Sequence, residues 1–319
     1  MSHETKNSIY YFICICIGAT AFQVYSEGLS RLHWTYAGFL FSIMSWLSVL
    51  YLHHASTNRL HTTANLELPE VAEDKKWFEL SRDEFITIFI KSILSFLSFA
   101  LMLPFMNDQD TAIYFTLAGA ALMRFLSIIA AQKLFGDKIG DKISFWAGFI
   151  ICLIGIAVYI YPKFENGSWS PVMLTASLLW SIVGILSEQT TRYITVDYSL
   201  RKVKIPLLSR VRLSIKTQQE KSELFKTIFF GIGMIVVFFW ANVSFSYPKL
   251  RELLSAFWIG YAVTVWGVTI SQGFKNKIGE TVSSILQSLR VVWALAFAPI
   301  IALIFSNPNS WEIWMDKFK

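Results

Sequence analysis

Residues 111–132 read TAIYFTLAGAALMRFLSIIAAQ, and this stretch decides the class of fold. Its length is close to the ~20 residues that cross the ~30 Å apolar core of a bilayer as one helix. Apolar side chains surround the whole helix instead of forming one stripe, which excludes a surface helix of a soluble protein. Arg124 lies near the middle of the run, where a charge costs about 2.5 to 3.5 kcal/mol. The stretch therefore predicts a transmembrane helix whose one charge has a function or a buried partner.

Eight further runs of the same kind flank this one. The nine predicted spans are residues 8–25, 34–52, 85–105, 111–132, 143–161, 171–186, 228–243, 253–271 and 282–305. The composition agrees, because 54% of the residues are hydrophobic, 16% are charged and the mean hydropathy is +0.48. A water-soluble domain is not built from such a sequence. We therefore expect an all-α polytopic membrane protein with about nine transmembrane helices.

Lysine and arginine residues are unequally divided between the two faces of the predicted bundle. Nineteen of the 28 lie on the face of the N-terminus, six lie on the other face and three lie within spans. Because basic connections stay in the cytoplasm, we expect a cytoplasmic N-terminus and an external C-terminus. The expected location is the inner (plasma) membrane of a bacterium. The net charge of +6 follows from this bias, and no nucleic-acid partner is expected.

The spans divide into two transmembrane units if the protein is built from two inverted halves. Residues 1–162 hold the first five spans, and residues 163–319 hold the other four. A basic connection at 193–225 separates the sixth and seventh spans. Between Arg201 and Lys221 its mixture of basic and apolar residues suits a segment that lies on anionic lipid headgroups. A solvated loop that only enforces the topology explains the same charges equally well.

The connection after the fourth span begins a recognisable pattern. Residues 135–137 read FGD, and the fifth span then carries Gly148 and Gly155 seven residues apart. Two glycines at that spacing share one helix face, where they would let a neighbouring helix approach closely. Together with the sequence LWS at 179–181 in the sixth span, these residues resemble the drug/metabolite transporter superfamily.

Members of that superfamily have ten helices in two inverted repeats of five. The resemblance implies the same architecture here, with Asp137 where the family usually has Glu and with the last helix missing. It also implies that a solute crosses by alternate rocking of the repeats around a central site. Branches of the superfamily that move phosphorylated or nucleotide-linked sugars have basic residues in the fourth and ninth helices. A homodimer is compatible with this architecture.

The two arginines within spans are the strongest candidates for a binding site. Arg124 and Arg290 lie in the fourth and ninth spans, which correspond to each other under an inverted repeat. Ser283 and Gln287 precede Arg290 at helical steps, and Ser127 shares a stripe with Arg124. Guanidinium groups can bind phosphate or carboxylate through two hydrogen bonds at once. The pattern predicts an anion site, unless each arginine instead pairs with a buried carboxylate.

Three more residues complete the candidate substrate-binding and coupling set. Lys91 in the third span either binds the anion or extends to the lipid headgroups. Tyr261 in the eighth span could donate a hydrogen bond into the same cavity. Glu188 faces inward from the sixth span. It is a candidate for proton coupling, or else for a structural ion pair with Arg192 or an arginine of the cavity.

These features favour a transporter that moves a small anionic metabolite, phosphorylated, nucleotide-linked or carboxylated, by alternating access. Two alternatives stay open, a membrane-embedded transferase acting on a lipid-linked phosphate or sugar, and a non-catalytic membrane subunit. An enzyme is less expected, because the sequence has no P-loop, GxSxG or HExxH motif. No cofactor or metal is expected either, since His53, His54 and His61 are not joined by a recurring set of further ligands.

Overall fold

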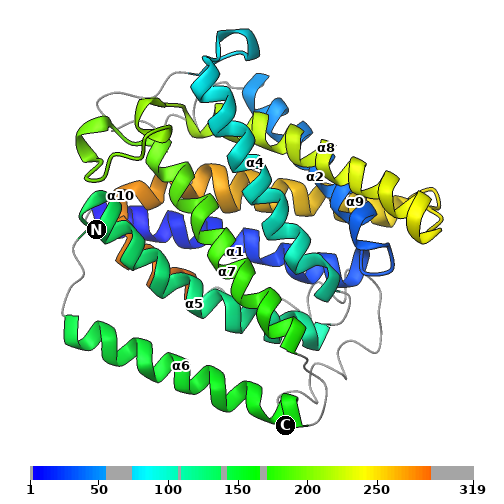
Figure 1. Ribbon diagram of the computed structural model, residues 1–319, viewed down its shortest axis with the longest axis horizontal. Coiled ribbons are helices and arrows are strands. Elements are labelled where there is room, and N and C mark those ends of the chain that lie inside the picture. The colour runs from blue at the N-terminus through cyan, green and yellow to red at the C-terminus, as the bar shows by residue number, and fades with distance from the viewer. Residues whose placement is uncertain (1–2, 55–73, 107–108, 138–141, 166–170, 289–319) are drawn as a thin grey trace.

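A computed structural model describes residues 3–54, 74–106, 109–137, 142–165 and 171–288 (Figure 1). The long helices are α1 (His3–Gly28), α2 (Trp34–His54), α4 (Arg82–Met102), α5 (Gln109–Phe135), α6 (Lys142–Glu165), α7 (Pro171–Thr195), α8 (Ile215–Ala241), α9 (Leu250–Gly260) and α10 (Ser271–Ser288). A π-helix, η5 (Tyr261–Ile270), joins α9 to α10. Single 3₁₀ turns are η1 (Trp77–Glu79), η2 (Leu103–Phe105), η3 (Tyr198–Leu200) and η4 (Leu208–Arg210). The predicted all-α fold is confirmed for these residues.

Four helical stretches in the described part of the chain are long and apolar enough to cross a membrane. They are Arg82–Phe105, Pro171–Thr195, Ile215–Ala241 and Leu250–Lys275. The protein is therefore a multi-pass integral membrane protein. The other predicted spans up to residue 271 also coincide with helices, whereas 282–305 lies mostly outside the described residues. The stretches that meet both criteria are thus fewer than the nine predicted spans.

Helices α7 and α8 extend beyond the predicted spans toward their common connection. α7 continues to Thr195, and α8 begins at Ile215. There the Ser214 hydroxyl accepts a hydrogen bond of 3.0 Å from the Thr217 backbone N–H, as an N-cap residue does. Hydropathy does not mark these extensions because they are rich in polar side chains, many of which are buried inside the protein. The basic connection predicted at 193–225 narrows to 196–214.

The connection 196–214 is folded around the side chain of Arg201. The guanidinium donates hydrogen bonds of 2.9 to 3.3 Å to the carbonyl oxygens of Val196, Leu208, Ser209 and Val211. It also lies over the rings of Tyr193 and Tyr198, 4.8 and 4.4 Å from the two centroids. The Arg201 guanidinium therefore holds the two ends of this connection together through hydrogen bonds.

The predicted contact of residues 201–221 with lipid headgroups stays a prediction, and the burial of its residues is uneven. Arg201 and Lys221, the two ends of the segment expected on the membrane surface, are both buried. Their charged groups face carbonyl oxygens and an aromatic ring of the protein. Lys202, Lys204 and Arg210 are exposed, and headgroup contact by these three stays a prediction.

The main helix contacts join the first half of the chain to the second half, and they follow the same pattern in both halves. α1 packs on α9, η5 and α10, just as α7 packs on α4 and α5. α2 packs on α9 while α8 packs on α4, and α2 and α8 pack on each other (Figure 1). Exchanging α1 with α7, α2 with α8, α4 with α9 and η5, and α5 with α10 leaves this set of neighbours unchanged. Such a set of neighbours is expected of two units with related topology.

Close helix approach occurs at glycines on both sides of this arrangement. A Cβ atom added to Gly260 in α9 would lie 2.6 Å from the backbone nitrogen of Ser45 and 2.9 Å from the carbonyl carbon of Met44 in α2. A Cβ atom added to Gly18 in α1 would lie 3.1 Å from the Cα atom of Gly267 in η5. Small residues at these positions bring the backbones together, as is common between membrane helices.

Gly148 and Gly155 do not have the predicted role among the described residues. No described atom lies within 4 Å of a Cβ atom added at either position. The reason is the place of α6, which lies at the edge of the bundle and packs along α5 (Figure 1). The glycine spacing alone could not show which face of the helix meets a neighbour.

We expect the substitution Gly260→Ala to lower the free energy of unfolding by about 1 to 3 kcal/mol, because the added methyl group meets backbone atoms of α2. The matched controls are Gly148→Ala and Gly155→Ala, where the space is open. They should be neutral or stabilise by up to about 1 kcal/mol, since alanine favours the helix more than glycine does. Unfolding in detergent measures all three. Equal effects at the three positions would contradict the close packing of α9 on α2.

Candidate functional site

A polar cavity of about 210 Å³ lies at the centre of the described bundle. Its walls come from α1, α4, α5, α7, α8, η5 and α10, so both groups of helices contribute. The charged side chains that line it are Lys91, Arg124, Lys226 and Lys275, together with Glu188 and Glu223. All four basic residues are at most 9% exposed. Basic side chains therefore outnumber acidic ones in the described lining.

An ion pair with three members crosses the cavity. The Lys275 ammonium in α10 donates to Oε1 of Glu188 in α7. The other carboxylate oxygen of Glu188 lies 3.6 Å from Nη1 of Arg124 in α5, which is within ion-pair distance. This Nη1 atom is buried and has no hydrogen-bond partner among the described residues, while Nη2 meets only the sulfur of Met123 at 3.8 Å. Arg124 thus retains donor capacity inside the cavity.

The second group of charges lies on α4 and α8. Lys226 forms an ion pair of 2.5 Å with Glu223 one turn earlier, and its ammonium lies 4.5 Å from the ring centroid of Phe99. Lys91 donates a hydrogen bond of 3.2 Å to Oε1 of Gln218. Three of the four basic side chains of the cavity therefore contact a carboxylate, and the basic residues of the lining outnumber the acidic ones by two. Buried excess charge is costly unless a counter-ion can be bound.

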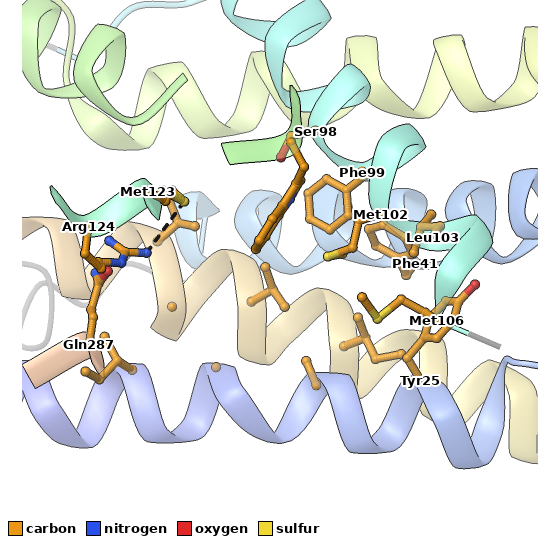
Figure 2. Close-up of a pocket in the computed structure, with 18 residues that line it drawn as sticks. Tyr25, Phe41, Ser98, Phe99, Met102, Leu103, Met106, Met123, Arg124 and Gln287 are labelled. Atoms are coloured by element: carbon orange, nitrogen blue, oxygen red, sulfur yellow. Dashed lines mark hydrogen bonds between the residues drawn. The ribbon is translucent and has the colours of Figure 1, made fainter. Parts of the chain in front are cut away.

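An apolar cavity of about 230 Å³ adjoins the polar one. Both cavities are lined by Ser98, Phe99, Met123, Arg124, Val263, Gly267, Val268 and Gln287. Figure 2 shows Arg124 and Gln287 at one end of this space, and Tyr25, Phe41, Met102, Leu103 and Met106 at the other. The centre of the protein therefore offers one charged compartment and one apolar compartment, and the two adjoin along eight shared wall residues.

Four of the residues predicted from the sequence meet in the polar cavity. They are Lys91, Arg124, Glu188 and Gln287. The Gln287 amide donates to the hydroxyl oxygen of Tyr11 in α1, which lines the same cavity. Lys91 is 2% exposed and turned into the protein, so it does not extend to the headgroups.

Three other predicted residues do not line either described cavity. Ser127 is buried and accepts a hydrogen bond of 2.8 Å from the amide of Gln189. Ser283 is buried in α10, and Tyr261 stacks on Phe257 with 6.1 Å between the ring centroids. These side chains share helices with the cavity residues but take part in packing. Arg290 lies outside the described residues, so its predicted pairing with Arg124 stays a prediction.

The structure shows partners for both residues that the sequence linked to each other, Glu188 and Arg192. The Arg192 guanidinium binds both carboxylate oxygens of Asp137 at 2.8 and 3.1 Å. That bidentate pair fastens the turn after α5 to α7 and lies beside the ring of Phe135. Glu188 instead joins the two cavity cations Arg124 and Lys275. The predicted salt bridge to an arginine of the cavity is confirmed.

Sequence reasoning missed Lys226, Glu223 and Lys275 as cavity residues. They were counted as charges of the connections, because each lies beyond the end of an apolar run. The periodicity did carry a signal: Gln219, Glu223 and Lys226 recur at steps of four and three, and Ser271 precedes Lys275 by four. Polar stripes of this kind face the protein interior when the helix lies in a membrane.

No model of a known protein family matches the chain, and no curated protein is similar enough to count as a match. The resemblance to the drug/metabolite transporter superfamily therefore stays a prediction. In the part of the chain that the structure describes, no group of three or more histidine, cysteine, aspartate or glutamate residues is placed to hold a metal ion.

Proposed function

We propose that this protein transports a small organic anion across the membrane. The observation that carries the proposal is the central cavity, whose described lining holds four basic side chains, Lys91, Arg124, Lys226 and Lys275, and two carboxylates, Glu188 and Glu223. An anion would neutralise the excess charge and use the free donor capacity of Arg124. Ionisable residues at the centre of a membrane bundle commonly mark the path of an ion or a substrate.

Two features of the helices support transport over simple binding. Corresponding helices of the two halves have corresponding neighbours. This is the arrangement expected of two units that rock against each other around a fixed site. The stretch η5 to α10 is also irregular, with a π-helix over Tyr261–Ile270 and a non-helical residue, Gly279, at a φ of 80°. Interrupted helices and π-helical segments recur at substrate sites. Lys275 lies between these two irregularities.

We further propose the architecture of two inverted repeats, divided near residue 162, with a cytoplasmic N-terminus. In such a transporter the Glu188 carboxylate would serve as the anion of the cationic site when no substrate is bound. We call it the resident anion. An entering substrate anion would share Arg124 and Lys275 with this carboxylate. The bridge between α5, α7 and α10 would then loosen as the site fills, which couples binding to movement of the helices.

The substitution Arg124→Gln is expected to weaken the affinity for the transported anion by about tenfold to a hundredfold, the value of one charge-assisted hydrogen bond or ion pair. Uptake into proteoliposomes of phosphate, glucose 6-phosphate, succinate and gluconate is measured, with glucose as the neutral comparison. Lys133→Gln is the matched control, since Lys133 is an exposed cation on the same helix.

Three results would count against this proposal. Uptake that is equal in protein-free vesicles, or equal for the Arg124→Gln and native proteins, would contradict an anion path through the cavity. A solute recovered in the vesicles with a bond cleaved or a group transferred would favour the membrane-embedded transferase instead.

A further inference from the structure

We infer that the anion is amphipathic, with a phosphate or carboxylate head and an apolar group about as large as one aromatic ring. This inference rests on the proposed function and adds the class of substrate to it. It comes from the apolar compartment that opens directly beside Arg124. A small hydrophilic anion would need only the charged compartment.

The walls of the apolar compartment are suited to an organic group. Besides Arg124 and Gln287 at one end, they are made of aromatic, aliphatic and methionine side chains and of small residues. The residues that form the far part are Tyr25, Phe41, Met102, Leu103 and Met106 (Figure 2). Methionine and aromatic side chains adapt to irregular apolar groups and contact rings favourably. Water would find few partners in such a space.

The size of the compartment limits the apolar group. Its volume of about 230 Å³ exceeds the roughly 150 Å³ of an apolar cavity that is known to hold one benzene ring. The charged compartment adds about 210 Å³ for the head. A ring attached to the head through one or two atoms fits this arrangement.

The position of Arg124 joins the two compartments. Its guanidinium has a free donor on the polar side, and its side chain lines the apolar side as well (Figure 2). A bound molecule would therefore place its charge at Arg124 and Lys275 and direct its apolar group toward Phe99 and Met102. Burial of a ring of this size strengthens binding by about tenfold to a hundredfold over the head alone.

The test compares two matched pairs of ligands on the full chain in nanodiscs. Dissociation constants are measured for phosphate and phenyl phosphate, and for acetate and phenylacetate, by the shift in melting temperature with ligand concentration. The native protein should bind the phenyl member of each pair at least tenfold more tightly. Arg124→Gln should weaken both members of each pair. Ala21→Phe and Met102→Trp each place a ring in the apolar compartment. In these variants the ratio of the two dissociation constants of each ligand pair should approach one.

The outcomes separate this inference from the proposed function. Leu47→Phe is the control, because Leu47 is exposed on α2 and the ratio should not change there. If the Arg124→Gln substitution changes the dissociation constant of neither pair, the proposed anion site is wrong. If both pairs depend on Arg124 but the native ratio is near one, the anion site stands and the amphipathic substrate is wrong. A ratio that survives both ring-inserting variants places the apolar group elsewhere and overturns the inference. The two variants occupy different helices, so misfolding of one leaves the other to decide.

Discussion

The substitution Glu188→Gln is expected to lower the free energy of unfolding by about 3 to 5 kcal/mol in buffer without multivalent anions. The carboxylate holds Lys275 on one oxygen and faces Arg124 with the other. An uncharged amide would remove the negative charge that lies between the two buried cations. Removal of one member from a buried ion pair is costly because the remaining charge is not solvated.

Added anion should reverse much of this loss. Phosphate in the cavity would take the place of the carboxylate, so it should raise the stability of the Glu188→Gln protein more than that of the native protein. Reversible unfolding in detergent, with and without phosphate, measures the difference. Glu79→Gln is the control, since Glu79 is exposed and does not line the polar cavity. A stable Glu188→Gln protein with no response to phosphate would show that Glu188 is not the resident anion of the site.

Arg201→Ala should have an effect of similar size, with a loss of more than about 4 kcal/mol. The guanidinium satisfies four carbonyl oxygens of the connection 196–214 and stacks on two tyrosine rings. Alanine would leave those carbonyl groups without their donor, and each hydrogen bond to a charged group contributes about 1.5 to 3 kcal/mol. The connection should then unfold locally and become sensitive to protease.

The neighbouring cation tests whether charge alone explains the effect. Lys202 is exposed, so Lys202→Ala should change stability by no more than about 0.5 kcal/mol. Arg201→Lys should restore only part of the loss, because a lysine cannot reach several carbonyl groups at once. Equal stability of Arg201→Ala and Lys202→Ala would contradict the folded connection.

Several parts of the fold were predictable from the sequence because hydrophobicity adds up locally along the chain. Long apolar runs must form helices in a bilayer, where each backbone group needs an internal hydrogen bond. The runs at 8–25, 34–52 and 85–105 accordingly match α1, α2 and α4 within a few residues. The ends of α7 and α8 were misplaced because their terminal turns are polar. Hydrophobicity does not mark these turns, which are buried by other helices.

Some residues of the candidate site could also be predicted from the sequence, and others could not. Arg124 was predictable as inward-facing, because a charge in the middle of an apolar run cannot face lipid. Glu188 was predictable from helical periodicity, whereas Lys91 was left with two alternatives. Tyr261 was placed in the cavity on similar grounds, but no such cost determines where a tyrosine points. Lys226 and Lys275 were not predictable from hydropathy, because a charge at the end of a run can be either a surface residue or a cavity residue.

The sequence by itself determined that this protein is an all-α membrane protein and that Arg124 must lie inside it. Only the tertiary structure decided which charges meet. Glu188 and Lys275 lie on different helices and are 87 residues apart in the chain, and no local pattern encodes their contact. The same holds for the apolar compartment, whose walls combine α1, α2, α4, α5, α7, α9, η5 and α10. Local burial energies set each helix, whereas the pairing of distant side chains follows from how those helices pack against one another.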